Sequence, residues 1–342
     1  MSSEVIRYDE TEILRAISHT DLVHGILKSG QAALLGMPLT LELYAVEVLA
    51  ICQRLTRLTQ SCLVTQGNYG RVETQLPADF SQRASGLMPT LAGGVANALT
   101  WLPNVGQGMV AATRAGKVME LAPTNLTDLV SNLSRLQAEQ PGSIRVEQIA
   151  GEGPRQFVAY LPGMTLSTVA SARDPFNLTS GIYALAGSGA SDAEAAATAA
   201  LRKAGVGAKP GDKVTLVGYS EGALVAANLA KTGEFRVSGV VSIGGQVDNV
   251  SVPKSVPVLS IEHNLDLPAK LDLKDNPNGQ NWLSVTLPST NPFNAHDIGN
   301  YLESAKHVDA GGYSAVARKL QEMLPATPQT VTGNVYRTEL VG

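Results

Sequence analysis

One short motif in this sequence combines a nucleophilic residue type with the spacing that would expose it. Gly218-Tyr-Ser-Glu-Gly222 follows the apolar run KVTLV and precedes ALVAANLA, a segment typical of a helix. A serine on a sharp strand-to-helix turn presents its hydroxyl above the end of a sheet, and small residues two positions away on each side avoid clashes. The pattern predicts a nucleophile elbow at Ser220. The alternative is an ordinary glycine-rich turn whose serine caps the helix.

An activated serine needs a base, and the base needs a partner that orients it. The sequence contains five histidines. His296 comes after the apolar run 282–287, and Asp266 comes after the apolar run 256–262. An elbow serine is followed along the chain first by its acid and then by its histidine. Ser220, Asp266 and His296 fit this order, which predicts a triad of nucleophile, acid and base.

Other residues compete for these roles. Glu262 and Asp272 are alternatives to Asp266 as the acid, whereas Asp297 is expected to cap a helix. The alternative for His296 is a surface histidine at the start of a helix. The remaining histidines are expected to have structural or solvated positions: His263 directly after a strand, His307 at a helix end, and His19 and His24 in an N-terminal helix.

Acyl transfer at a serine also needs backbone N–H groups that hold the developing oxyanion. The N–H of Glu221, at the start of the helix, is the first expected donor. The loop Pro162-Gly-Met-Thr165 after the run QFVAYL supplies the second, for which we expect the N–H of Met164. The alternative is that Gly163 belongs to a plain loop. In the expected mechanism, water finally hydrolyses an acyl-enzyme.

The elements that must position these residues follow from periodicity. After Gly142, apolar strand-like runs alternate with helical patterns. Largely apolar strands between helices predict an α/β fold with a mostly parallel sheet that is covered on both faces. The expected strands are a hairpin at 143–150 and 156–161, then 214–217, 237–243, 256–262 and 282–287; the expected helices are 125–139, 191–204, 221–232, 298–306 and 311–324.

The first third of the chain has a different character. Residues 8–28 and 40–65 carry apolar stripes at helical spacing and predict an αα-hairpin. The Gly/Ala-rich stretch 66–120 is expected to form loops and short helices. We therefore expect three parts: a helical N-terminal region (1–124), an α/β domain (125–325) and a loose C-terminal tail (326–342).

Composition excludes several classes of function. The chain of 342 residues is 44% hydrophobic and has a formal net charge of −4, which disfavours nucleic-acid binding. Two cysteines exclude a disulfide framework and a four-cysteine zinc site, and the histidines lack paired metal-ligand spacing. We therefore expect no metal site. The sequence also shows no secretory signal and no uncharged transmembrane helix.

Several segments, in order, resemble actinobacterial α/β-hydrolases of the serine-esterase type, which are related to cutinases and to the hydrolase domain of PE-PPE proteins. The matching segments include SIRVEQIAG, FVAYLPGM, GDKVTLVGYSEGALVAANLA, VPVLSIEHNLDLPAKLD and PFNAHDIGNYLESA. The resemblance implies a cofactor-free esterase or lipase with an α/β-hydrolase domain and the triad Ser220, Asp266 and His296. The sequence departs from the family pattern at Glu221, where Gln is common, and at Met164, where Thr is frequent. Its acid loop is also one residue shorter.

The N-terminal helices are similar to the helical-hairpin modules of type VII secretion substrates. This similarity implies export and a secretion-system or immunity partner. The alternative is that the helices merely extend or cap the hydrolase, in a cytoplasmic protein. The leading hypothesis is a carboxyl-ester hydrolase. The low charge of the chain, together with the uncharged segment 84–113 as an apolar lid or interface, slightly favours a lipid-like ester over other small-molecule esters. The alternatives are an acyltransferase that uses the same triad, and an inactive hydrolase-fold secretion substrate or interaction protein.

Overall fold

The computed structural model describes the sheet-forming part of the chain. The predicted N-terminal helices, with His19 and His24, lie outside the described residues, and so does Asp272. The described ranges are 109–164, 173–177, 180–181, 184, 191–266, 277–289, 294–325 and 329–341.

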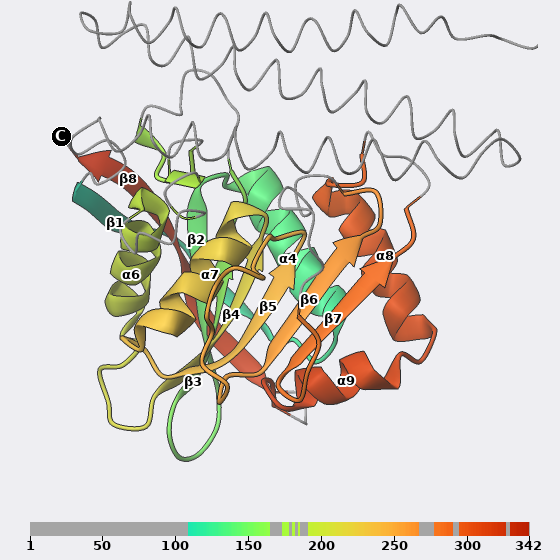
Figure 1. Ribbon diagram of the computed structural model, residues 1–342. Coiled ribbons are helices and arrows are strands. Elements are labelled where there is room, and N and C mark those ends of the chain that lie inside the picture. Colours follow the sequence, from blue (N-terminus) through green and yellow to red (C-terminus); the bar gives the residue numbers. More distant parts are fainter. Residues whose placement is uncertain are drawn as a thin grey trace, which may run out of the picture. The chain divides into compact units, whose positions relative to one another are not determined.

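An eight-stranded mixed sheet forms the centre of this part, in the order β1-β8-β2-β3-β4-β5-β6-β7 (Figure 1). Strands β3 to β7 are parallel to one another, whereas β1, β8, β2 and β3 are antiparallel neighbours. The strands are β1 (Met109–Leu121), β2 (Ser143–Ile149), β3 (Gln156–Leu161), β4 (Lys213–Tyr219), β5 (Val237–Ile243), β6 (Val258–His263), β7 (Trp282–Leu287) and β8 (Thr330–Val341).

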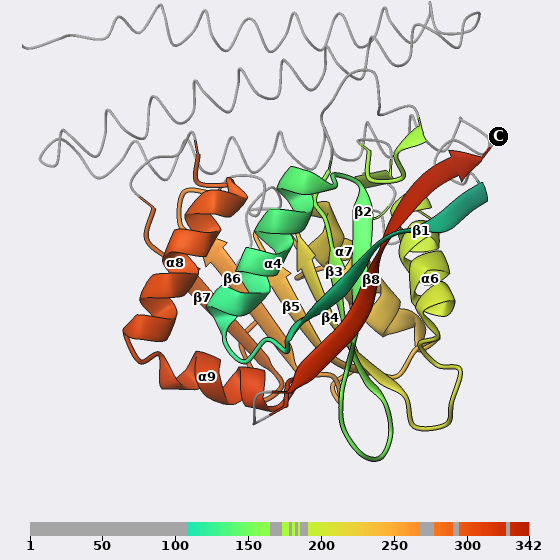
Figure 2. The same cartoon turned by 180° about the vertical axis from the view of Figure 1, so that it is seen from behind.

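Helices cover both faces of the sheet. Figure 1 shows α6 and α7 in front of the strands, and Figure 2 shows α4 and α8 on the opposite face. Separate apolar clusters fill the two interfaces, one with residues of α6 and α7 and the other with residues of α4, α8 and α9. This three-layer arrangement confirms the predicted α/β class. The helices are α4 (Leu126–Glu139), α6 (Asp192–Ala204), α7 (Glu221–Thr232), α8 (Ile298–Ala310) and α9 (Ser314–Gln321).

Local sequence signals explain why helix α6 begins and ends where the sequence predicted. The hydroxyl of Ser191 accepts a hydrogen bond from the N–H of Glu194 at 3.2 Å. Gly205 ends the helix in the left-handed conformation, with a φ of 84°, which a residue without Cβ adopts readily. Both ends of the helix are therefore specified by local contacts, which is why its bounds could be predicted from the sequence.

The prediction of a loose C-terminal tail was wrong. Residues Thr330–Val341 form β8, which lies inside the sheet between β1 and β2. Val331 and Val335 pack into the cluster beneath α4, whereas Tyr336 packs into the cluster beneath α6. Burial on both faces therefore holds this segment in an extended conformation.

The prediction of loops and short helices up to residue 120 was wrong from Met109 onward. This segment is β1, an edge strand that pairs antiparallel with β8 and shifts register between Arg114 and Gly116. Its Ala and Gly residues have low strand propensity, but pairing along most of its length overrides that preference. The sheet therefore extends beyond the predicted 125–325 domain at both ends. Within the described ranges, no helix has both the length and the apolar character that crossing a bilayer requires.

Candidate active site

The predicted elbow joins β4 to α7, and its backbone is strained. Ser220 has φ 53° and ψ −120°, the one positive φ outside glycine in the described part of the chain. Such a conformation costs free energy and persists only where neighbours enforce it. Here the N–H of Ser220 donates to the carbonyl of Ile243 at 2.9 Å, and its carbonyl accepts from the N–H of Ala223 at 3.0 Å. The end of β5 and the first turn of α7 therefore hold the serine in place.

The glycines of the motif are required by close backbone contacts. A Cβ on Gly218 would lie 2.2 Å from the carbonyl oxygen of Gly222. A Cβ on Gly222 would lie 2.3 Å from the carbonyl oxygen of Leu161, at the end of β3. Both distances are shorter than any real carbon–oxygen contact, so neither position accepts a side chain without displacing the turn. The GxSxG spacing is thus a steric requirement of this turn.

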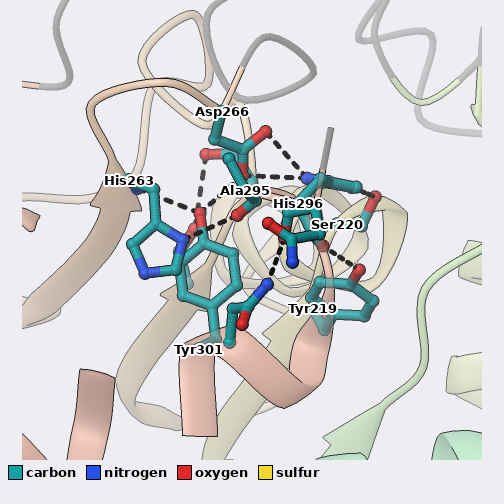
Figure 3. A network of polar contacts seen from close by, with 11 residues as sticks. Tyr219, Ser220, His263, Asp266, Ala295, His296 and Tyr301 are labelled. Carbon is teal, nitrogen blue, oxygen red and sulfur yellow. Dashed lines mark hydrogen bonds and ion pairs between the residues drawn. The ribbon is translucent and has the colours of Figure 1, made fainter. Parts of the chain in front are cut away.

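The three residues of the predicted triad form one chain of hydrogen bonds (Figure 3). The Ser220 hydroxyl lies 2.9 Å from Nε2 of His296. Nδ1 of His296 lies 2.9 Å from each carboxylate oxygen of Asp266. The Asp266 side chain is fully buried, whereas that of His296 is 28% exposed. This geometry suits an imidazole that donates through Nδ1 and accepts the serine proton at Nε2.

A second buried residue, which the sequence analysis missed, binds the same carboxylate. The hydroxyl of Tyr301 lies 2.5 Å from Oδ2 of Asp266. The backbone N–H of His263 donates to this hydroxyl at 3.1 Å. Burial and the nearby Asp266 carboxylate raise the pKa of Tyr301 well above its ordinary value, so the phenol stays protonated. Nothing in the sequence spacing indicated this contact, since Tyr301 looks like an ordinary residue in the first turn of α8.

Two further side chains hold the loop that carries His296. Tyr219 donates its hydroxyl to the backbone carbonyl of His296, and its ring stacks on the imidazole with the centroids 5.3 Å apart. His263 contacts the carbonyl of Ala295 through Nδ1 at 2.6 Å and the Ser304 hydroxyl through Nε2 at 2.8 Å. The prediction that His263 has a structural position is confirmed. The residues on both sides of the Ala295–His296 peptide are therefore anchored, Ala295 to the buried ring of His263 and His296 to the partly buried ring of Tyr219.

The competing residues that the structure describes have positions other than that of the triad acid or base. Glu262 is buried within β6, and the carboxylate bonded to His296 is that of Asp266. Asp297 caps α8 by accepting from the N–H of Gly299 at 2.7 Å, as predicted. His307 is in the last turn of α8, as predicted, and its Nδ1 contacts the carbonyl of Glu303.

The loop after β3 passes directly against the nucleophile. A Cβ on Gly163 would lie 2.7 Å from the Tyr219 ring and 3.2 Å from Cβ of Ser220. The N–H of Gly163 itself donates to the side chain of Gln137 at 3.0 Å. The next N–H along the chain belongs to Met164. The N–H of Glu221 lies in the first turn of α7, where N–H groups have no partner within the helix. Both expected oxyanion donors thus belong to segments beside Ser220, and their role stays a prediction.

The side chain of Glu221 is buried beside the nucleophile. Burial raises its pKa well above the ordinary value, the carboxylates of Asp174, Asp192 and Glu194 act in the same direction, and the Ser180 hydroxyl opposes the rise. Within the described ranges, neither carboxylate oxygen makes a hydrogen bond of normal geometry. Burial therefore favours the neutral form of this side chain, and in that form it adds no negative charge next to a developing oxyanion.

Neither a metal site among the described residues nor a similar known protein indicates what this site does. Among the described residues, no group of three or more His, Cys, Asp or Glu side chains is arranged to hold a metal ion. No protein-family model, no curated protein and no solved structure matches this chain.

Proposed function

We propose that this protein is a serine hydrolase that cleaves carboxylic esters. The observation that carries the proposal is the continuous hydrogen-bonded chain from Asp266 through His296 to Ser220, which sits on a strained strand-to-helix turn. A serine in this arrangement loses its proton to the imidazole as it attacks a carbonyl carbon. The resemblance to actinobacterial serine esterases and lipases supports the same proposal.

The reaction proceeds in two acyl transfers, from the ester to Ser220 and then from Ser220 to water. His296 takes the Ser220 proton at Nε2, and the new bond between Oγ and the acyl carbon places a negative charge on the carbonyl oxygen. The N–H groups of Glu221 and Met164 stabilise that oxyanion. Asp266 stabilises the imidazolium, which returns its proton to the leaving alcohol. Water, deprotonated by the same imidazole, then releases the acid and frees Ser220.

Labelling with a fluorophosphonate probe tests this proposal directly, because the probe reacts only with an activated serine. The wild-type protein is expected to be labelled and to hydrolyse nitrophenyl esters, and the Ser220→Ala variant is expected to do neither. Ser314→Ala, which removes an exposed serine at the start of α9, is the matched control and should behave like the wild type.

A series of nitrophenyl esters with short and long acyl chains then separates a small-molecule esterase from a lipase. A preference for long chains would support the lipid-like substrate that the low charge of the sequence favours. A folded wild-type protein that is neither labelled nor active on any ester of the series would overturn the proposed function.

A further inference from the structure

We propose that Tyr301 is a positioning residue for the acid of the triad. Its hydroxyl orients the Asp266 carboxylate toward His296 and neutralises part of its charge, and in this way sets the pH range in which the imidazole serves as a base. This inference rests on the proposed function, since it assigns a role in the same site. The contact between the two side chains is visible in Figure 3.

The direction of the Tyr301 hydrogen bond follows from its two partners. The backbone N–H of His263 can only donate, so the phenol oxygen accepts at 3.1 Å. The phenol proton is therefore free to point at Oδ2 of Asp266, 2.5 Å away. A carboxylate is an acceptor, so this contact is a hydrogen bond to a charged group, one of the stronger kinds in proteins. Oδ2 thus interacts with donors on two sides, the Tyr301 hydroxyl and Nδ1 of His296.

The Tyr301 ring has little room to move, which makes it a fixed support. The ring is 1% exposed and stacks on the His263 imidazole, with the centroids 4.0 Å apart and the planes 15° apart. On another side it packs against Gly244, where an added Cβ would lie 3.0 Å from the ring. His263 is itself held by the carbonyl of Ala295. The same packed unit therefore fixes Asp266 through Tyr301 and the His296 loop through His263.

The hydrogen bond also limits how strongly the carboxylate holds a proton on the imidazole. A hydrogen bond to the charged form of a carboxyl group favours that form and spreads its charge. Without the Tyr301 hydroxyl, Asp266 would attract the imidazolium proton more strongly, and a higher pH would be needed to produce the neutral base. Other ionisable side chains near Asp266 act equally in the wild type and in a variant without the Tyr301 hydroxyl. They are Tyr219 of β4, Glu262 and His263 of β6, and Asp297 at the start of α8.

The test compares Tyr301→Phe with Tyr336→Phe. Both rings are 1% exposed, but the Tyr336 hydroxyl makes no hydrogen bond to the described residues, and β8 contributes nothing to the triad. We expect Tyr301→Phe to lower kcat by about 10- to 100-fold, the effect of losing a hydrogen bond to a charged group, with KM little changed. The acid limb of kcat/KM should move up by about one pH unit, while Tyr336→Phe keeps the wild-type profile.

Two outcomes separate this inference from the proposed function. If the wild type is active and Tyr301→Phe keeps both its kcat and its acid limb, the positioning role is wrong while the hydrolase stands. If the wild type is inactive, the role of Tyr301 can still be tested by ¹⁵N NMR titration of the His296 ring in the Ser220→Ala protein. Adding Tyr301→Phe is expected to raise its titration midpoint, and an unchanged midpoint would overturn the role.

A second measurement needs no variant of Tyr301 and covers the case in which Tyr301→Phe does not fold. In protein labelled with ¹³C at the phenol carbons, the Tyr301 signal should shift when Asp266 is changed to Asn, because the amide replaces a charged acceptor. The Tyr336 signal should not shift. A Tyr301 signal that stays in place would show that the hydroxyl does not bond to the carboxylate.

Discussion

Two buried polar networks in the described part of the chain pair a tyrosine hydroxyl with a carboxylate, and they differ in how the carboxylate is neutralised. The first network ends at a partly exposed imidazole and a serine hydroxyl. The second is closed by an arginine whose side chain is 6% exposed. The first consists of Tyr301, Asp266, His296 and Ser220; the second consists of Tyr160, Glu147, Arg145, Asn132 and Glu120.

The closed network connects three strands to a helix. Nε of Arg145 donates to Glu147 at 2.5 Å, and its Nη2 donates to Glu120 of β1 at 2.9 Å. The Tyr160 hydroxyl of β3 accepts from the side chain of Asn132 on α4 at 2.9 Å. Burial raises the pKa of Glu147, and the Arg145 guanidinium opposes this rise. A guanidinium stays charged at any pH a protein survives. This network therefore holds α4 against the sheet, links β1 to β2 within it, and transfers no proton.

The open network lacks a permanent cation among its four members. Its positive charge appears only when the imidazole takes a proton, which is what a base in a reaction must do. The comparison indicates that a buried carboxylate stabilises the fold where its cation is fixed, and serves proton transfer where its cation is transient. Substitutions that remove one charge from each network test this distinction.

Replacing the acid of the open network should have the largest effect. Asp266→Asn keeps the shape of the side chain but removes the charge that stabilises the imidazolium. We expect kcat to fall by about 10³- to 10⁴-fold, as when the acid of a serine triad is made neutral. Nitrophenyl-ester kinetics measure this loss.

The matched control for that substitution is Asp297→Asn. Asparagine caps a helix about as well as aspartate, so the activity should stay within about twofold of the wild type. If the two variants instead have similar activity, Asp266 is not the acid, and Glu262 or Asp272 becomes the candidate.

The closed network should respond in stability and not in catalysis. Arg145→Met leaves the Glu147 carboxylate, which is 0% exposed, without its guanidinium partner. We expect a loss of about 3–5 kcal/mol in the free energy of unfolding, typical of breaking a buried ion pair from one side. Urea denaturation measures it, and kcat per folded molecule should be unchanged.

Arg135→Met is the control, since this arginine also contacts Glu120 but its side chain is 43% exposed. Its loss should be about 0–1 kcal/mol, as for surface ion pairs. Equal losses in the two variants would mean that burial of the Arg145–Glu147 pair does not set its contribution.

The sequence predicted the parts of the fold whose signals are local. Strands 237–243 and 282–287 and helix 221–232 have the predicted bounds, because glycine or proline flanks mark where their apolar patterns stop. Strand β8 was missed because its pairing with β1 and β2 joins distant parts of the chain, and a proline-rich stretch at 325–328 resembled the start of a tail. Pairing between distant strands leaves little trace in a local pattern.

The same division applies to the candidate site. Contact among Ser220, Asp266 and His296 could be predicted, since the carboxyl ends of parallel strands meet at one edge of the sheet. The roles of Tyr219 and Tyr301 could not, because they depend on the direction of each ring in the packed core. A motif reports backbone geometry, whereas the groups that tune a reactive side chain come from packing.

One buried glutamate, Glu221, borders the open network, and another, Glu147, belongs to the closed network; the two should respond oppositely to the same substitution. Glu221 has a raised pKa in the folded protein. Below about pH 4 it is protonated in both the folded and unfolded states, and the stability is unaffected. Above that pH the unfolded chain loses the proton while the folded chain retains it, so the wild type loses stability as the pH rises toward the raised pKa. Glu221→Gln removes this loss.

The expected result is a melting temperature for Glu221→Gln that matches the wild type near pH 4 and exceeds it increasingly as the pH rises from there. The acidic groups that face Glu221, namely Asp174, Asp192 and Glu194, raise the pKa in the wild type, while the Ser180 hydroxyl lowers it. In contrast, Glu147→Gln should lower the melting temperature, because it leaves the Arg145 guanidinium with Glu120 alone. A difference between Glu221→Gln and the wild type that does not change with pH would mean that Glu221 ionises in the folded protein as it does in the unfolded chain. A negative charge would then lie beside the oxyanion at neutral pH.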